Sequence, residues 1–198
     1  QPFSVSLALN TPDAKQRAVV FHRSRAWTDA GSRGYQLLIE DGKLSASLIH
    51  FWPGNAISVK TKQAIPVNRW VDVAVAYDGS ISAKGISIFI DGKQVDVEVV
   101  KDKLTKNITG GGGNTIAIGA RFRDRGFTNG QVSSFEVFDR QISNFEVALK
   151  HDEKQISAKL QQIESETELS ESIRAMFVQH LELNASADHA EYRKQLAS

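Results

Sequence analysis

Arginine and tryptophan side chains gather in one segment of the sequence where they could bind an anionic sugar. Arg23 and Arg25 stand two residues apart, just before Trp27, in the stretch HRSRAWTD. Successive side chains of an extended chain point to opposite faces, so residues two apart share a face. A planar guanidinium suits carboxylate and sulfate groups, and an indole ring offers an apolar surface to the face of a sugar.

The same chemistry recurs in two other segments. GARFRDRG carries three arginines at alternate positions, and FWPGN carries a tryptophan and an amide. Aromatic rings with a few polar neighbours are the usual composition of a ligand site. The sequence therefore predicts a ligand-binding set formed by Arg23, Arg25, Trp27, Trp52, Asn55, Arg121, Arg123 and Arg125.

A structural role fits these residues equally. Arg23, Arg25 and Arg33 could clamp Asp29 and backbone carbonyls. Arg123 and Arg125 could clamp Asp124 or a neighbouring loop. Tryptophans at the base of a loop often cap a core. Ordering long side chains costs conformational entropy that paired charges can offset. We therefore expect segment 22–36 to be ordered, with a charge-assisted hydrogen bond from Arg23 or Arg25.

The carboxylates and histidines do not predict catalysis. Glycosidases place two carboxylates across the scissile bond. Asp96 and Glu98 alternate along a strand but indicate its solvent-facing side, whereas Glu136 and Asp139 are three apart and do not share a strand face. The histidines lack ligand spacing, and the sequence has no cysteine. We expect no catalytic residue and no metal site among them.

Short apolar runs separated by turns must position these side chains. The expected strands are rich in Val, Ile, Phe and Tyr, and Asp-Gly or Asn-Gly pairs supply the positive φ angles of tight hairpins. GGGG at 110–113 lacks a following Lys-Ser/Thr, so it predicts a flexible loop tip and not a phosphate loop. The strands are expected at 3–9, 18–22, 35–40, 44–51, 70–77, 86–90, 115–120 and 132–138.

The apolar period changes to that of helices after residue 140. Ile156, Leu160 and Ile163 share one helix face, and a second set with helical spacing follows in 173–181. Isolated short helices are marginal in water, so these apolar faces need a partner. The sequence predicts a short α-helical extension over 151–198, which either packs on the sandwich or belongs to the domain that follows.

Composition excludes two classes of partner. The 198 residues carry a net charge of +1 and no basic run, so we expect no binding to nucleic acid. No run of eighteen apolar residues is present, so we expect no membrane insertion. The first residues, Gln1-Pro2-Phe3, lack a methionine, which is typical of a piece of a longer protein.

Four motifs stand in the order found in laminin-G-like domains: NRWVDVAVAYDGS (68–80), ISIFIDGK (86–93), TIAIGAR (115–121) and GQVSSFEVFDRQISNFEVA (130–148). Residues 1–150 therefore resemble a laminin-G-like domain of the concanavalin-A-like lectin/glucanase superfamily. The resemblance implies a mainly β fold, an antiparallel concanavalin-A-like sandwich or jelly roll, in which Trp70 anchors a strand. The Glu-x-Asp-x-x-Glu pattern of the superfamily's glucanases is absent.

Segment 21–57 resembles more specifically the laminin-G-like insert of large planctomycete proteins that carry cytochrome-c-like domains and domains of unknown function. This resemblance implies export to the periplasm or beyond, with neighbouring domains of the same chain as partners. We expect a non-catalytic recognition module with an acidic glycan as its candidate ligand. The alternative is a structural spacer that docks neighbouring domains, and a glycoside hydrolase-like enzyme is a distant third.

Calcium is the one cofactor left open by the resemblance. Laminin-G-like relatives often hold calcium at a rim through carboxylate and carbonyl oxygens. Asp29, Asp124 and Asn129 lie in expected loops and could contribute. The sequence lacks a dense carboxylate loop, so we expect that no metal is bound.

Overall fold

A computed structural model describes residues 1–151 of the chain. The chain divides into two units, one formed by Gln1–Ile90 with Gln94–Gln141 and the other by Asp91–Lys93 with Ile142–Ser198. The expected helices of 151–198 lie outside the described residues. The boundary expected at residue 150 stays a prediction.

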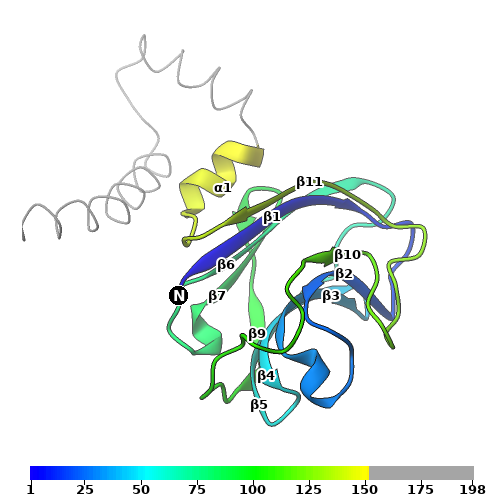
Figure 1. The fold of residues 1–198 in the computed structure, drawn as a ribbon. Coiled ribbons are helices and arrows are strands. Elements are labelled where there is room, and N and C mark those ends of the chain that lie inside the picture. Colours follow the sequence, from blue (N-terminus) through cyan, green and yellow to red (C-terminus); the bar gives the residue numbers. More distant parts are fainter. Residues whose placement is uncertain (152–198) are drawn as a thin grey trace, which may run out of the picture. The chain divides into compact units, whose positions relative to one another are not determined.

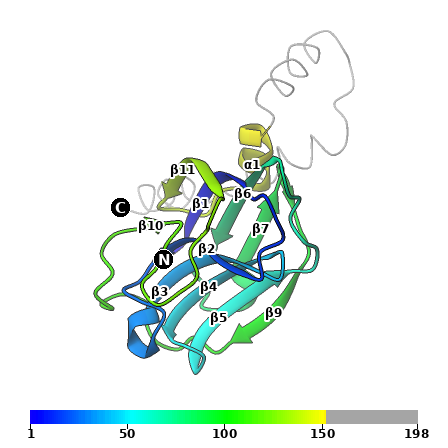
Figure 2. The ribbon, with the colours of Figure 1, turned by 90° about the vertical axis from the view of Figure 1, so that its right-hand side faces the viewer.

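The first unit is a sandwich of two antiparallel sheets, which confirms the predicted fold class (Figure 1). One sheet has the order β11-β1-β6-β7-β8, and the other has the order β10-β2-β3-β4-β5-β9, whose strands lie side by side in Figure 2. The strands are β1 Phe3–Asn10, β2 Arg17–Arg23, β3 Gly34–Glu40, β4 Lys43–Phe51, β5 Asn55–Thr61, β6 Trp70–Tyr77, β7 Ile86–Ile90, β8 Lys93–Gln94, β9 Val97–Asp102, β10 Ala117–Ile118 and β11 Gln131–Phe138.

Three features of the strands differ from the expectation. The two-residue strand β8 was not expected. β5 was missed, although Ile57 and Val59 alternate with short or polar residues along it and are buried. The run expected over 115–120 pairs only at Ala117 and Ile118, because the chain then turns away at Gly119, which has φ of 77°. The 3-10 helices η1 Asp29–Ser32 and η2 Ala83–Gly85 lie in two of the connections.

The core lies between the two sheets and is built by alternation. Leu7 and Leu9 of β1 and Val71 and Val73 of β6 are almost fully buried, whereas the residues between them face outward. Burial of each such side chain stabilises the folded state by about 1.5–3 kcal/mol relative to leaving it exposed. At one end of the core, aromatic rings replace the aliphatic residues.

The second unit, as far as it is described, contains α1 (Asn144–His151) and the Asp91–Lys93 turn. A reciprocal cap begins the helix, because Ser143 Oγ accepts the N–H of Glu146 and Glu146 Oε2 accepts the N–H of Ser143. A Cβ at Gly92 would meet the Cβ of His151 at 3.0 Å, so glycine allows the helix end to lie against this turn.

Candidate functional site

A cavity of about 770 Å³ lies at one end of the sandwich. It is placed where β2 and β11 end and where β1 and β3 begin, and the loop from β9 to β10 forms one side. Phe3, Tyr35 and Tyr77 line it, with the ring centroid of Phe3 at 4.8 Å from that of Tyr35 and 5.7 Å from that of Tyr77. Ligand sites are commonly cavities of this kind, largely apolar and aromatic with a few convergent polar groups.

The charged side chains that line this end cavity are mostly basic: Arg23, Arg33 and Lys106 against Asp139. Arg33 is engaged, because its Nε donates to the carbonyl oxygen of His50 at 3.2 Å. Arg23 is partly buried, yet within residues 1–151 its guanidinium makes no hydrogen bond or ion pair. The cavity wall therefore holds a cation that is free to meet an anionic ligand.

Arg23 and Tyr35 lie directly opposite each other in the β2–β3 ladder. Directly paired residues of antiparallel strands project to the same face, which places the guanidinium beside the phenol. Burial raises the pKa of the Tyr35 phenol, and the charge of Arg23 opposes that rise without cancelling it. Tyr35 is therefore neutral at physiological pH and has a hydroxyl hydrogen to donate.

Glycines allow the β9–β10 loop to approach the arginine-bearing segment closely. A Cβ at Gly111 would lie 2.7 Å from the Cβ of Arg33, and one at Gly113 would lie 2.5 Å from the carbonyl carbon of Ser24. Such contacts are too short for any larger residue. This packing against the cavity wall explains two glycines of the run that was expected to be a flexible tip, Gly111 and Gly113.

A second group of side chains, the Arg–Trp cluster, consists of Arg17, Trp27, Gln36, Glu40, Arg121 and Asp124. The ring of Trp27 lies between two guanidinium groups, 4.6 Å from Arg17 and 4.7 Å from Arg121. Arg17 donates to Asp124 Oδ1 at 2.8 Å and to Glu40 Oε1 at 2.6 Å. Arg121 donates to Asp124 Oδ2 and to Gln36 Oε1.

The electrostatics of the Arg–Trp cluster follow from burial and pairing. Burial lowers the pKa of Arg121, and its hydrogen bond to Asp124 opposes this effect. Burial alone would raise the pKa of Asp124, but hydrogen bonds from Arg17 and Arg121 outweigh it and leave that pKa lowered. Both oxygens of Asp124 accept these donors, so this carboxylate does not fit a calcium site.

The structure divides the predicted ligand-binding residues among several places. Arg23 lines the end cavity, whereas Trp27 and Arg121 belong to the Arg–Trp cluster, and the ring of Trp52 lies 5.8 Å from that of Trp27. Asn55 fastens the β9–β10 loop, because its amide donates to Thr105 Oγ1 at 2.6 Å. The remaining three, Arg25, Arg123 and Arg125, are exposed.

The expected hydrogen bond from Arg23 or Arg25 was a wrong prediction: in the described part of the chain neither side chain makes one. Side chains alternate between two faces along this segment. His22 and Ser24 therefore face the Arg–Trp cluster, and Arg23 and Arg25 point away from it. His22 Nδ1 lies 2.9 Å from Ser24 Oγ, and Arg121 Nη1 donates to that same hydroxyl at 3.4 Å. Arg33 clamps a backbone carbonyl, as predicted. The arginines that clamp Asp124 are Arg17 and Arg121 and not the predicted Arg123 and Arg125.

The aromatic lining of the end cavity was not predicted. Phe3 and Tyr77 are paired across β1 and β6, although they are far apart in the sequence. Each looks like an ordinary core residue of its own strand. Only knowledge of the strand pairing could have placed them together.

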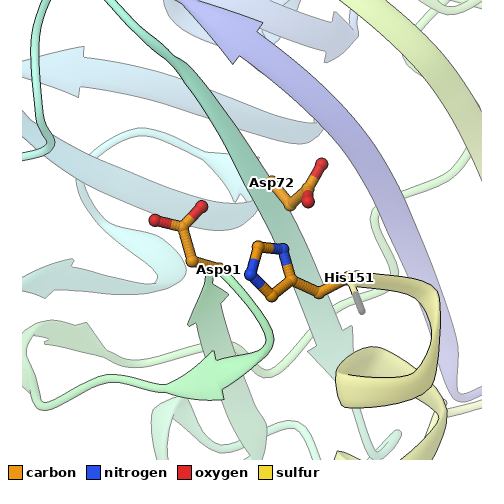
Figure 3. Close-up of side chains that lie close together, drawn as sticks. All are labelled: Asp72, Asp91 and His151. Atoms are coloured by element: carbon orange, nitrogen blue, oxygen red, sulfur yellow. The ribbon is translucent and has the colours of Figure 1, made fainter. Parts of the chain in front are cut away.

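Two further groups of titratable residues lie outside the end cavity and the Arg–Trp cluster. Asp96 and Glu98 are exposed, as expected for the solvent side of a strand. Figure 3 shows Asp72 on β6, together with Asp91 and His151. Asp72 belongs to the first unit and the other two to the second, so we assign no metal site to this set.

Residues 1–148 match the family Laminin_G_3, described as the concanavalin A-like lectin/glucanases superfamily, and the chain belongs to this family. No curated protein matches the sequence. Among residues 1–151, no helix is long and apolar enough to cross a membrane.

Three solved structures illustrate the fold. The Ruminococcus gnavus IT-sialidase CBM40 bound to alpha2,3 sialyllactose has a TM-score of 0.59 at 14% identity, over 76% of this chain and 83% of that one. A putative carbohydrate binding protein from Bacteroides ovatus has a TM-score of 0.52 at 15% identity, over 74% and 40%. The binding domain of botulinum neurotoxin serotype D/C has a TM-score of 0.54 at 14% identity, over 77% and 36%. The chain thus spans well under half of the latter two, and these identities establish the fold alone.

Proposed function

We propose that the sandwich is a non-catalytic glycan-recognition module whose end cavity binds a carboxylated sugar. The observation that carries the proposal is the guanidinium of Arg23, which has no partner within residues 1–151, in a cavity lined by aromatic rings. Removing a charge from water without a partner is unfavourable, and a carboxylate ligand would supply that partner. An arginine fork can meet both carboxylate oxygens at once.

The other lining residues complete the recognition of a sugar. The ring of Tyr35 offers an apolar surface, and its hydroxyl can donate to a ligand oxygen beside Arg23. Asp139, also in the lining, can accept hydrogen bonds from sugar hydroxyls. Lys106 adds a second mobile positive charge. A ligand with one carboxylate and several hydroxyls satisfies this set.

The structural relatives support this class of ligand without deciding it. One relative is described as bound to alpha2,3 sialyllactose and another as a putative carbohydrate binding protein. We further infer from the laminin-G-like resemblance that the module works outside the cytoplasm within a larger protein. Its sites would then face extracellular or periplasmic polymers.

A structural spacer is the second candidate function, and one observation favours it. Trp27, Asn55 and Arg121, all predicted to bind ligand, are engaged in internal contacts. If the whole domain serves only to hold neighbouring domains, Arg23 has no ligand to bind. The two functions therefore differ in what the Arg23 side chain does.

The test is binding of oligogalacturonate and oligoglucuronate by isothermal titration calorimetry to the 198-residue chain, its Arg23→Gln variant and its Arg25→Gln variant. Charged hydrogen bonds contribute about 1.5–3 kcal/mol, so Arg23→Gln should weaken binding roughly tenfold to a hundredfold. Arg25 is exposed and outside the cavity lining, so its variant is the matched control. Equal loss in both variants, or no binding of either oligomer, would reject the cavity as an acidic-glycan site.

A further inference from the structure

Trp70, the first residue of β6, exposes 47% of its surface. The sequence predicted that this ring anchors the strand. The anchor is instead the next residue, Val71, which is fully buried in the core. Nearly half of the surface of this indole is therefore open to contact from outside the domain.

Two amide side chains lie in line with Trp70 across the five-stranded sheet. Asn10 of β1 is paired with Trp70 on one side and with Gln131 of β11 on the other. Directly paired residues share a face and have Cβ atoms about 4.5–5.5 Å apart. The face is the outer one, because Leu9 and Val71, each one residue along, point into the core.

The polar side-chain atoms of the row make no hydrogen bonds among the described residues. Within residues 1–151, neither the amides of Asn10 and Gln131 nor the indole N–H of Trp70 has a hydrogen-bond partner. Asn10 is partly buried and Gln131 is exposed. The row therefore offers one flat apolar ring with several free donors and acceptors beside it.

We propose that the row formed by Trp70, Asn10 and Gln131 is a second binding surface, which takes a neutral polysaccharide chain. The apolar face of a sugar ring stacks on the indole, and the amides meet the hydroxyls of the next sugars. The row crosses three strands, a span of roughly 10 Å at the usual strand spacing, which suits an extended chain better than a compact ligand.

Charge favours a neutral ligand at this surface. The three side chains of the row are uncharged, so they offer no ionic partner to a charged polymer. The end cavity, with its excess of basic side chains, has the opposite preference.

This inference does not rest on the proposed function, because the row and the end cavity have no residue in common. Either surface can bind its ligand when the other does not. Variants at Arg23 and at Trp70 therefore separate the two proposals.

The experiment is affinity electrophoresis of the 198-residue chain in native gels that contain laminarin, xyloglucan or galactomannan. At least one of these polymers should retard the wild-type protein. Trp70→Ala should weaken that retardation about tenfold, which corresponds to loss of one stacked ring. Asn10→Ala and Gln131→Ala should weaken it less, and Trp70→Phe should restore part of it.

A control distinguishes the row from a general effect. Phe122→Ala removes the ring of a side chain that is 68% exposed outside the row, so its retardation relative to a polymer-free gel should equal that of the wild type. Thermal unfolding of Trp70→Ala shows whether the fold is retained, and Gln131→Ala, at an exposed position, tests the row independently of that result. Wild-type migration unaffected by all three polymers, or equal retardation of all these variants, overturns the proposal.

Discussion

The guanidinium of Arg121 donates to the carboxylate of Asp124 with 3.0 Å between Nε and Oδ2, although the two residues are only three apart. Both side chains are almost fully buried, with 0% and 2% exposure. The turn between them places Phe122 and Arg123 in solvent. The alternating arginines of GARFRDRG therefore have different roles. Arg121 stabilises the loop through a buried ion pair, whereas Arg123 and Arg125 are exposed.

Removal of the Asp124 carboxylate should be strongly destabilising. Asp124→Ala leaves the guanidinium groups of Arg17 and Arg121 without their shared partner, and breaking a buried ion pair in this way costs about 3–5 kcal/mol. Urea unfolding followed by tryptophan fluorescence measures the loss. The matched control is Arg123→Gln, an exposed position in the same loop, which should change the free energy of unfolding by less than about 0.5 kcal/mol. Similar values for the two variants would contradict the bracing role.

Stability should fall on mild acidification because of His22. Burial lowers the pKa of His22 below its usual 6.5, and the nearby charge of Arg121 acts in the same direction. The unfolded chain then binds a proton more readily than the folded one, so the stabilisation is complete above pH 6.5 and is lost as pH falls below it. Unfolding free energies between pH 8 and pH 5 measure the slope.

The His22→Gln variant separates this effect from that of other groups. It should be less stable than the wild type at neutral pH, and its stability should depend less on pH below 6.5. Asp124 has a lowered pKa too, so its contribution is present above 3.8 and is lost only as pH falls below that value. A wild-type profile parallel to that of His22→Gln would show that the histidine is not the cause.

The sandwich could be predicted from sequence because its signals are local. Asp-Gly hairpins at 41–42 and 91–92 adopt positive φ as expected, and the alternation along β1 and β6 marks the core face. The site could not be predicted in the same way. Arg17 and Asp124 are partners across 107 residues, and nothing near either one identifies the other. The exposure of Trp70 could not be predicted either. Its apolar ring predicts burial, but the strand register places the ring on the outer face of the sheet.

The packing of the glycine run predicts a coupled loss of stability and binding. Gly113→Ala would place a Cβ at 2.5 Å from the carbonyl carbon of Ser24, so the β9–β10 loop must move away from the cavity wall. Both the melting temperature and the affinity for oligogalacturonate should fall. Gly110→Ala is the control, because Gly110 has a φ of 79° but nothing within 4 Å of an added Cβ. Backbone strain alone should lower the free energy of unfolding of Gly110→Ala by about 1 kcal/mol, and the variant should still bind oligogalacturonate. A Gly113→Ala protein with unchanged affinity would show that the loop does not shape the cavity.

Glycans that bind the end cavity should not be hydrolysed. Glycosidases need two carboxyl groups about 5–9.5 Å apart, one to protonate the leaving oxygen and one to act as nucleophile or base. Among the described residues that line the cavity, Asp139 is the one carboxylate, so the second role has no candidate among them. Incubation with oligogalacturonate and with laminarin should therefore release no more reducing ends than a heat-inactivated sample. Release that disappears in Asp139→Asn would identify an enzyme, whereas release that persists in that variant would point to a contaminant.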